Sequence, residues 1–165
     1  MHYLHLISVQ ASNEEEALEL VDSALDPYGR GDVWDYYTVG GRWDGYFSNG
    51  KNTLRYTDNP KEFIEVLEKH MESRNRIVSA AAHKLMGVGV LQELAQGTPI
   101  SDYAQFGDEH LILWEFCKAC SLRYTSTSGF YDYTEGMPAD ATELLSRVSL
   151  DTGDQEWLVV VDLHN

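Results

Sequence analysis

The chain has 165 residues, with 12 Lys and Arg against 27 Asp and Glu, and a formal net charge of −15. Hydrophobic residues make up 43% and aromatic residues 12% of it, which indicates a single folded domain over 1–165 and excludes an intrinsically disordered chain. No run approaches the roughly 18 apolar residues of a membrane span. No basic segment followed by a cleavage site opens the chain, so we expect no signal peptide.

The strong excess of acid also bears on possible partners. Binding to nucleic acid requires clustered Lys and Arg that replace the counterions of the phosphates, so we expect no direct nucleic-acid partner. An anionic membrane surface is disfavoured for the same reason. Residues 14–35 contain eight acids and one base, and residues 132–156 contain seven acids and one base. These blocks are either a solvated surface or an acidic face that docks on a basic protein.

The first two elements follow from apolar periodicity. Residues 2–10 are apolar on both faces of an alternating pattern, which predicts a central strand. A helix follows up to the stop at Asp26-Pro27, and its predicted cap is a capping box of Ser12 and Glu15.

A segment rich in glycine and aromatic residues comes next. It predicts one or two short strands, around 33–39 and 45–47, joined by a turn at Gly40-Gly41. Asn59-Pro60 then begins a long helical pattern that is either one helix or two with a break near Gly87.

The C-terminal part predicts a mixture of helix and strand. We expect a helix over 108–120, although residues 111–114 also fit a strand. A hairpin of 122–127 and 130–134 follows, and then a helix over 138–148. The apolar run 157–161 predicts a strand over 156–164 that is buried on both faces.

This order of elements predicts an α+β fold whose terminal strands are adjacent in one sheet. The specific hypothesis is a ferredoxin-like sandwich with a helical insertion at about 59–120. Cys117 and Cys120 lack the second ligand pair of a zinc site, so we interpret them as reduced thiols and assign no metal and no cofactor.

The first candidate site is the loop around the paired glycines. Glycines allow a close approach of the backbone, Arg42 offers a planar fork for carboxylate or phosphate, and aromatic rings offer stacking surfaces. We therefore predict a binding site for an anionic or planar ligand. The alternative is a structural hairpin turn in which Arg42 pairs with Asp35 or Asp44. The predicted ligand-binding residues are Tyr37, Gly40, Gly41, Arg42, Trp43 and Asp44.

The second candidate site is the end of the last strand. Alternation places Asp162 and His164 on one face, as an acid/base pair or half of a metal site. If the terminal strands pair, His2 or His5 approaches His164. The alternative is a polar strand end that faces water.

Two boxes of this sequence resemble those of a group of small bacteriophage proteins of unknown function. One is the run from Trp34 through Gly40-Gly41-Arg42-Trp43 to Gly45, and the other is 157–164, which ends in Asp162-Leu163-His164. The resemblance covers about a sixth of the chain. It implies a phage-encoded protein in a host cytoplasm, without an established activity.

Three hypotheses of function remain. The first is an acidic accessory protein that binds and modulates a basic host or defence protein. The second is a ligand-binding protein or enzyme in which Arg42 holds an anion and Asp162 with His164 transfers protons. The third is an assembly protein whose long helices form a homo-oligomer.

Overall fold

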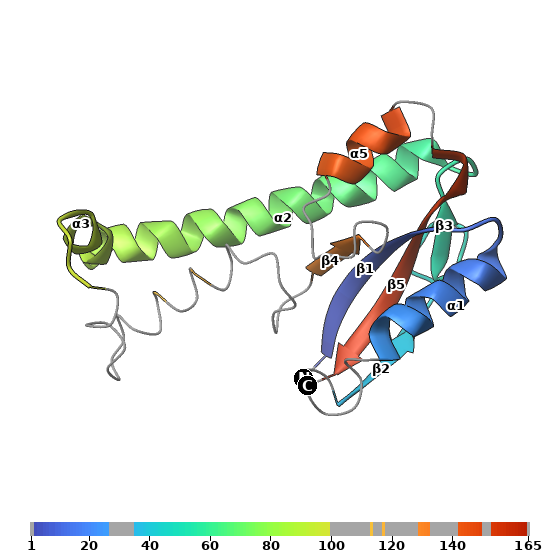
Figure 1. Ribbon diagram of the computed structural model, residues 1–165, viewed down its shortest axis with the longest axis horizontal. Coiled ribbons are helices and arrows are strands. Elements are labelled where there is room, and N and C mark those ends of the chain that lie inside the picture. Colours follow the sequence, from blue (N-terminus) through green and yellow to red (C-terminus); the bar gives the residue numbers. More distant parts are fainter. Residues whose placement is uncertain are drawn as a thin grey trace. The chain divides into compact units, whose positions relative to one another are not determined.

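The computed structural model describes residues 2–26, 35–99, 113, 117, 129–132, 142–149 and 153–164. Over these residues the fold is α+β, as predicted, and combines helices with a five-stranded sheet (Figure 1). The strands are β1 (His2–Gln10), β2 (Tyr36–Val39), β3 (Thr53–Arg55), β4 (Gly129–Asp132) and β5 (Glu156–His164). The helices are α1 (Glu14–Leu25), α2 (Pro60–Gly87), α3 (Val90–Ala95) and α5 (Thr142–Ser149), with short 3-10 turns η2 (Gly41–Trp43) and η4 (Gly153–Gln155).

The two terminal strands form the centre of the sheet, which confirms their predicted adjacency. β1 and β5 pair antiparallel over their whole length, from His2 opposite His164 to Gln10 opposite Glu156. All residues from Glu156 to Leu163 are buried, as the continuous apolar run predicted. This pairing brings the two ends of the chain side by side (Figure 1).

The remaining strands pair with the two outer sides of this central pair. β4 lies parallel to β1. β2 and β3 both pair antiparallel with β5, β2 near its end and β3 near its beginning. The sheet order is therefore β2-β5-β1-β4, with β3 also paired to β5.

The strand predicted around 33–39 is confirmed over its described part, whereas the second strand predicted at 45–47 is wrong. β2 covers only 36–39 of the described residues, residues 45–47 are not a strand, and the second short strand is β3. Phe47 is nonetheless buried, with 2% of its surface exposed. Its apolar side chain packs into the core although the residue lies in a turn. In the sequence, a buried aromatic residue of this kind cannot be told from part of a strand.

The cap of α1 lies one residue later than predicted. The side chain of Asn13, not Ser12, accepts a hydrogen bond from the Glu16 N–H, at 3.0 Å. The Glu16 carboxylate in turn accepts from the Ser12 N–H at 2.7 Å. The helix ends at Leu25, immediately before the predicted stop, and buries Ala17, Val21, Ala24 and Leu25.

The long helical pattern consists of two helices. α2 begins at Pro60 and ends at Gly87, so the break falls at the predicted glycine, and α3 starts at Val90 after Gly89 in a left-handed conformation. In the C-terminal part, α5 confirms the helix predicted over 138–148 for its described residues. β4 overlaps one arm of the predicted hairpin, while the other arm, 122–127, lies outside the described residues. So does most of the helix predicted over 108–120, of which Leu113 and Cys117 are described and helical.

Backbone contacts divide the chain into two compact units. The first contains residues 1–70 and 126–165, with the whole sheet, α1 and α5, and the second contains residues 71–125. Among the helices that the structure describes, none combines the length and the apolar character that crossing a membrane requires. The sites described below lie in the first unit.

Candidate functional site

The paired glycines bring their loop against the end of β5. The Gly40 N–H donates to the Val160 carbonyl at 2.9 Å, and η2 begins at once. Gly40 and Gly41 have φ values of 74° and 56°, which L side chains rarely adopt. A Cβ on Gly41 would lie 2.5 Å from the Asp162 Cβ. Glycine is therefore required for this loop to approach Asp162.

Asp162 is the centre of the site. Its side chain is only 4% exposed, and its two oxygens face Nδ1 of His2 at 2.9 and 3.0 Å. One of these oxygens also accepts the Arg42 backbone N–H at 3.1 Å. A buried carboxylate needs such donors, since an unpaired one is costly to desolvate. Asp162 thus joins the first strand, the last strand and the glycine loop.

The pairing with Asp162 sets the orientation of His2. A carboxylate only accepts hydrogen bonds, so Nδ1 of His2 carries the proton and Nε2 of the neutral ring offers a lone pair. The His2 side chain is 19% exposed, against 4% for Asp162. This combination is the arrangement of a general base held by a buried carboxylate.

His164 extends the cluster from the neighbouring position on β5. Its ring lies edge-to-face with His2 at 4.7 Å and stacks on Tyr36 at 4.6 Å with an interplanar angle of 8°. Its Nδ1 lies 3.2 Å from the Asp35 carboxylate. We call His2, Asp162, His164, Tyr36 and the Arg42 backbone the terminal-strand site.

Of the predicted ligand-binding residues, Tyr37 lies away from this site. In the register of the sheet, Tyr36 and Thr38 share the face of His164 and Asp162, whereas Tyr37 pairs with Leu163 on the other face. The Tyr37 hydroxyl donates to the Asp22 carboxylate of α1 at 2.6 Å. Burial and this bond raise the pKa of Tyr37 to about 12. Tyr36 is therefore the ring beside the predicted acid/base residues.

The other loop residues have separate roles. Asp44 accepts a hydrogen bond from the Asn52 amide at 2.7 Å, and Asn52 also accepts from the Gly45 N–H. Trp43 is half-buried and Arg42 is exposed. Among the residues that the structure describes, neither Asp35 nor Asp44 forms an ion pair with the Arg42 guanidinium, so the predicted structural pairing is wrong.

Two features of the site were outside the reach of the sequence analysis. The sequence places either His2 or His5 near His164, but it does not identify His2 as the direct partner of Asp162. Strand register decides between them: His2 pairs with His164 on the site's face, and His5 pairs with Val161 on the opposite face. Burial lowers the pKa of His5 to about 4, so it is a neutral core residue near pH 7. No sequence pattern pointed to Asn52, because its side chain stabilises the loop through the Gly45 N–H and the Asp44 carboxylate.

Within the described residues, no three His, Cys, Asp or Glu side chains are placed to hold a metal ion together. Comparison of the chain with protein-family models, with curated proteins and with solved structures gives no match.

Proposed function

We propose that the terminal-strand site binds a small anionic or planar ligand and transfers a proton to or from it. The observation that carries this proposal is Asp162, a buried carboxylate that holds the His2 ring and the Arg42 N–H at the same time. Asp162 thereby fixes an imidazole beside the glycine loop, at an end of the sheet where His2 is partly exposed. Asp162 orients the His2 imidazole through Nδ1, so Nε2 points away from Asp162 and is available to a ligand.

The residues of the terminal-strand site have separate roles in this proposal. His2 is the general base or acid, and Asp162 holds its tautomer. His164 and Tyr36 form a stacked pair that offers a surface for a planar group. The exposed Arg42 guanidinium supplies the charge that attracts an anion, because its backbone N–H rather than its side chain is used by Asp162.

Titration with inorganic phosphate, followed by NMR of the histidine ring protons, tests this proposal. We expect phosphate to shift the His2 and His164 resonances in the wild type. The variant Arg42→Gln should lose the shift, and Arg76→Gln on α2, which removes the same charge elsewhere, should keep it. Equal shifts in both variants, or no shift in the wild type, would contradict the proposal.

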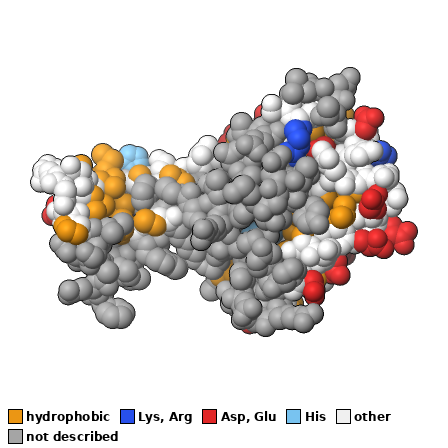
Figure 2. Space-filling view, viewed as in Figure 1, with side chains coloured by type: hydrophobic (Ala, Val, Ile, Leu, Met, Phe, Trp, Pro, Cys, Tyr) orange, Lys and Arg blue, Asp and Glu red, His pale blue; other side chains and the backbone are white. Residues whose placement is uncertain are grey.

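A second candidate function is favoured by the surface of α1. Glu15, Glu19, Asp22 and Asp26 are all exposed and recur at the spacing of one helix face. Figure 2 shows acidic side chains gathered over this helix. Such a stripe suits the accessory protein predicted above, encoded by a phage and acting on a basic host or defence protein in the host cytoplasm.

Binding to poly-lysine at low salt, measured by fluorescence anisotropy, tests the location of this second function. One variant neutralises the stripe (E15Q/E19Q/D22N/D26N), and its control neutralises four other exposed acids (D58N/E65Q/E68Q/E72Q), so both have the same net charge. We expect the stripe variant to bind more weakly than the control. Equal binding would show that net charge alone acts.

Two further predictions remain proposals. The ferredoxin-like sandwich is supported by β5, β1 and β4 lying side by side, with β1 antiparallel to β5 and parallel to β4. Self-association through the helices of residues 59–120 would be measured as a mass above that of one chain in analytical ultracentrifugation.

A further inference from the structure

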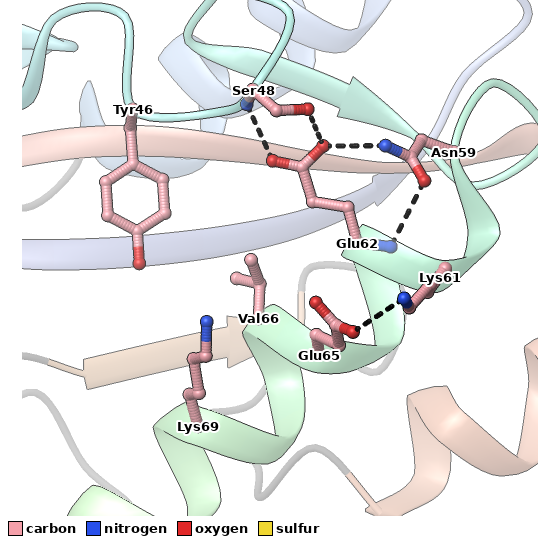
Figure 3. Close-up of a pocket in the computed structure, with 8 residues that line it drawn as sticks. All are labelled: Tyr46, Ser48, Asn59, Lys61, Glu62, Glu65, Val66 and Lys69. Atoms are coloured by element: carbon pink, nitrogen blue, oxygen red, sulfur yellow. Dashed lines mark hydrogen bonds and ion pairs between the residues drawn. The ribbon is translucent and has the colours of Figure 1, made fainter.

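A separate cavity lies between the turn that follows η2 and the first half of α2 (Figure 3). Its volume is about 380 Å³, within the range of small-molecule sites. Tyr46 and Ser48 line it from the turn, and residues from Asn59 to Lys69 line it from the helix. None of these residues belongs to the terminal-strand site.

The walls of this cavity are fixed by Glu62. Its carboxylate accepts hydrogen bonds from the Ser48 N–H at 2.6 Å, from the Ser48 hydroxyl and from the Asn59 amide at 2.9 Å. The Glu62 N–H donates back to Asn59 at 3.2 Å. These bonds tie the turn to the helix, so the cavity is formed before any ligand arrives, which lowers the ordering cost of binding.

The charges around the cavity leave one cation without a partner. The Glu62 carboxylate is stabilised by three hydrogen-bond donors. Lys61 forms an ion pair with Glu65, at 3.7 Å between nitrogen and oxygen. Lys69 has no ion pair or hydrogen bond with the other described residues. Figure 3 shows its ammonium projecting toward the space in front of Val66.

The other side of this space is aromatic and apolar. The Tyr46 ring is 39% exposed and is held edge-to-face, at 5.2 Å, against the buried Phe47. Tyr46 and Lys69 both project toward the region beside Val66 (Figure 3). A phenol is protonated near neutral pH, and burial raises the pKa of Tyr46 further, so its hydroxyl is available as a donor.

We propose that this cavity binds a small organic monoanion, namely a carboxylate carried on a flat apolar ring. The carboxylate lies between the Lys69 ammonium and the Tyr46 hydroxyl, and the ring packs against Val66. A multiply charged anion such as a nucleotide is disfavoured, because Glu62 and Glu65 line the same cavity and the chain has a net charge of −15. The terminal-strand site plays no part in this binding.

Three probes of the same shape and different charge test the proposal: benzoate, neutral benzamide and cationic benzamidine. Binding is followed by the backbone amide shifts of the full-length protein in NMR titrations. We expect benzoate to shift the amides of Tyr46, Ser48 and Lys69 and to bind about fivefold more tightly than benzamide, the effect of one partly exposed charge pair. Benzamidine should bind most weakly.

Paired variants locate the cation. Lys69→Gln should abolish the preference for benzoate over benzamide, whereas Lys84→Gln, which removes the same charge outside the cavity, should retain it. Tyr46→Ala should weaken both probes. The proposal is overturned if no probe shifts these amides, if benzamide binds as tightly as benzoate, or if the two lysine variants behave alike.

Discussion

Two buried carboxylates stand on the same face of β5, one at each end, and their partners differ in kind. Glu156 is fully buried and meets Arg147 at 3.0 Å and the Gln10 amide at 2.7 Å. Asp162 meets His2 and a backbone N–H. Arg147 is a guanidinium that stays charged at any accessible pH, whereas the partners of Asp162 are an imidazole and a peptide N–H. The Glu156 end is therefore a buried ion pair, and the Asp162 end is the one to which we assign the proposed proton transfer.

The largest expected effect comes from the Glu156 end. In Arg147→Met the Glu156 carboxylate stays buried without its cation, so we expect the free energy of unfolding to fall by about 3 kcal/mol. Urea denaturation at neutral pH measures it. Asp162→Asn keeps the shape of its side chain and an acceptor for the Arg42 N–H, so it should cost less. A larger loss in D162N than in R147M would contradict the assigned difference between the two ends.

A comparison of histidines sharpens the same contrast. The pKa of His5 is lowered from 6.5 to about 4 by burial, so below pH 6.5 the unfolded chain binds a proton that the folded chain does not. The contribution of His5 to the free energy of unfolding is therefore fully present above pH 6.5. It is lost as the pH drops toward 4, which lowers the free energy of unfolding by up to about 3 kcal/mol. His5→Phe should remove this part of the pH dependence, as measured by urea denaturation from pH 7 to 4. Identical slopes in variant and wild type would contradict a neutral buried His5.

The glycine loop offers a smaller and more local test. Gly41→Ala introduces a Cβ at φ 56° within 2.5 Å of the Asp162 Cβ, whereas Gly50→Ala has φ 72° and nothing within 4 Å of the new atom. Both pay the backbone strain of roughly 1–2 kcal/mol, and only G41A must also displace Asp162. We expect G41A to be the less stable variant in urea denaturation and to expose the Arg42 amide to faster hydrogen exchange. Equal stability would mean that the loop does not need its close approach to Asp162.

The sequence predicted the centre of the fold better than its edges. The runs at 2–10 and 156–164 are largely apolar on both faces, so the pattern alone identified both strands, the burial of β5 up to Leu163 and the buried middle of β1. β3 was missed because only three residues pair, and because Phe47 carries the apolar signal from a turn. Short edge strands are selected by their neighbour, here β5, and this information is not local.

The candidate site was predictable to the same extent. Alternation correctly placed Asp162 and His164 on one face, and the paired glycines correctly marked a close backbone approach. The pairing of Asp162 with His2 depends on the register between two strands more than 150 residues apart in the chain. Tyr37 was grouped with the site because the sequence does not show which residues of this segment pair with β5. A shift of one residue in that pairing moves a side chain to the opposite face of the sheet, and here it is Tyr36 that shares the face of His164.

The most direct test of the account is the tautomer of His2, read from long-range ¹⁵N–¹H correlations of the neutral ring. We predict that Nδ1 carries the proton in the wild type, because the buried Asp162 carboxylate accepts from it, and that Asp162→Ala shifts the proton toward Nε2. A wild-type His2 protonated at Nε2, or a tautomer unchanged in D162A, would show that Asp162 does not orient His2 and would remove the basis of the proposed site.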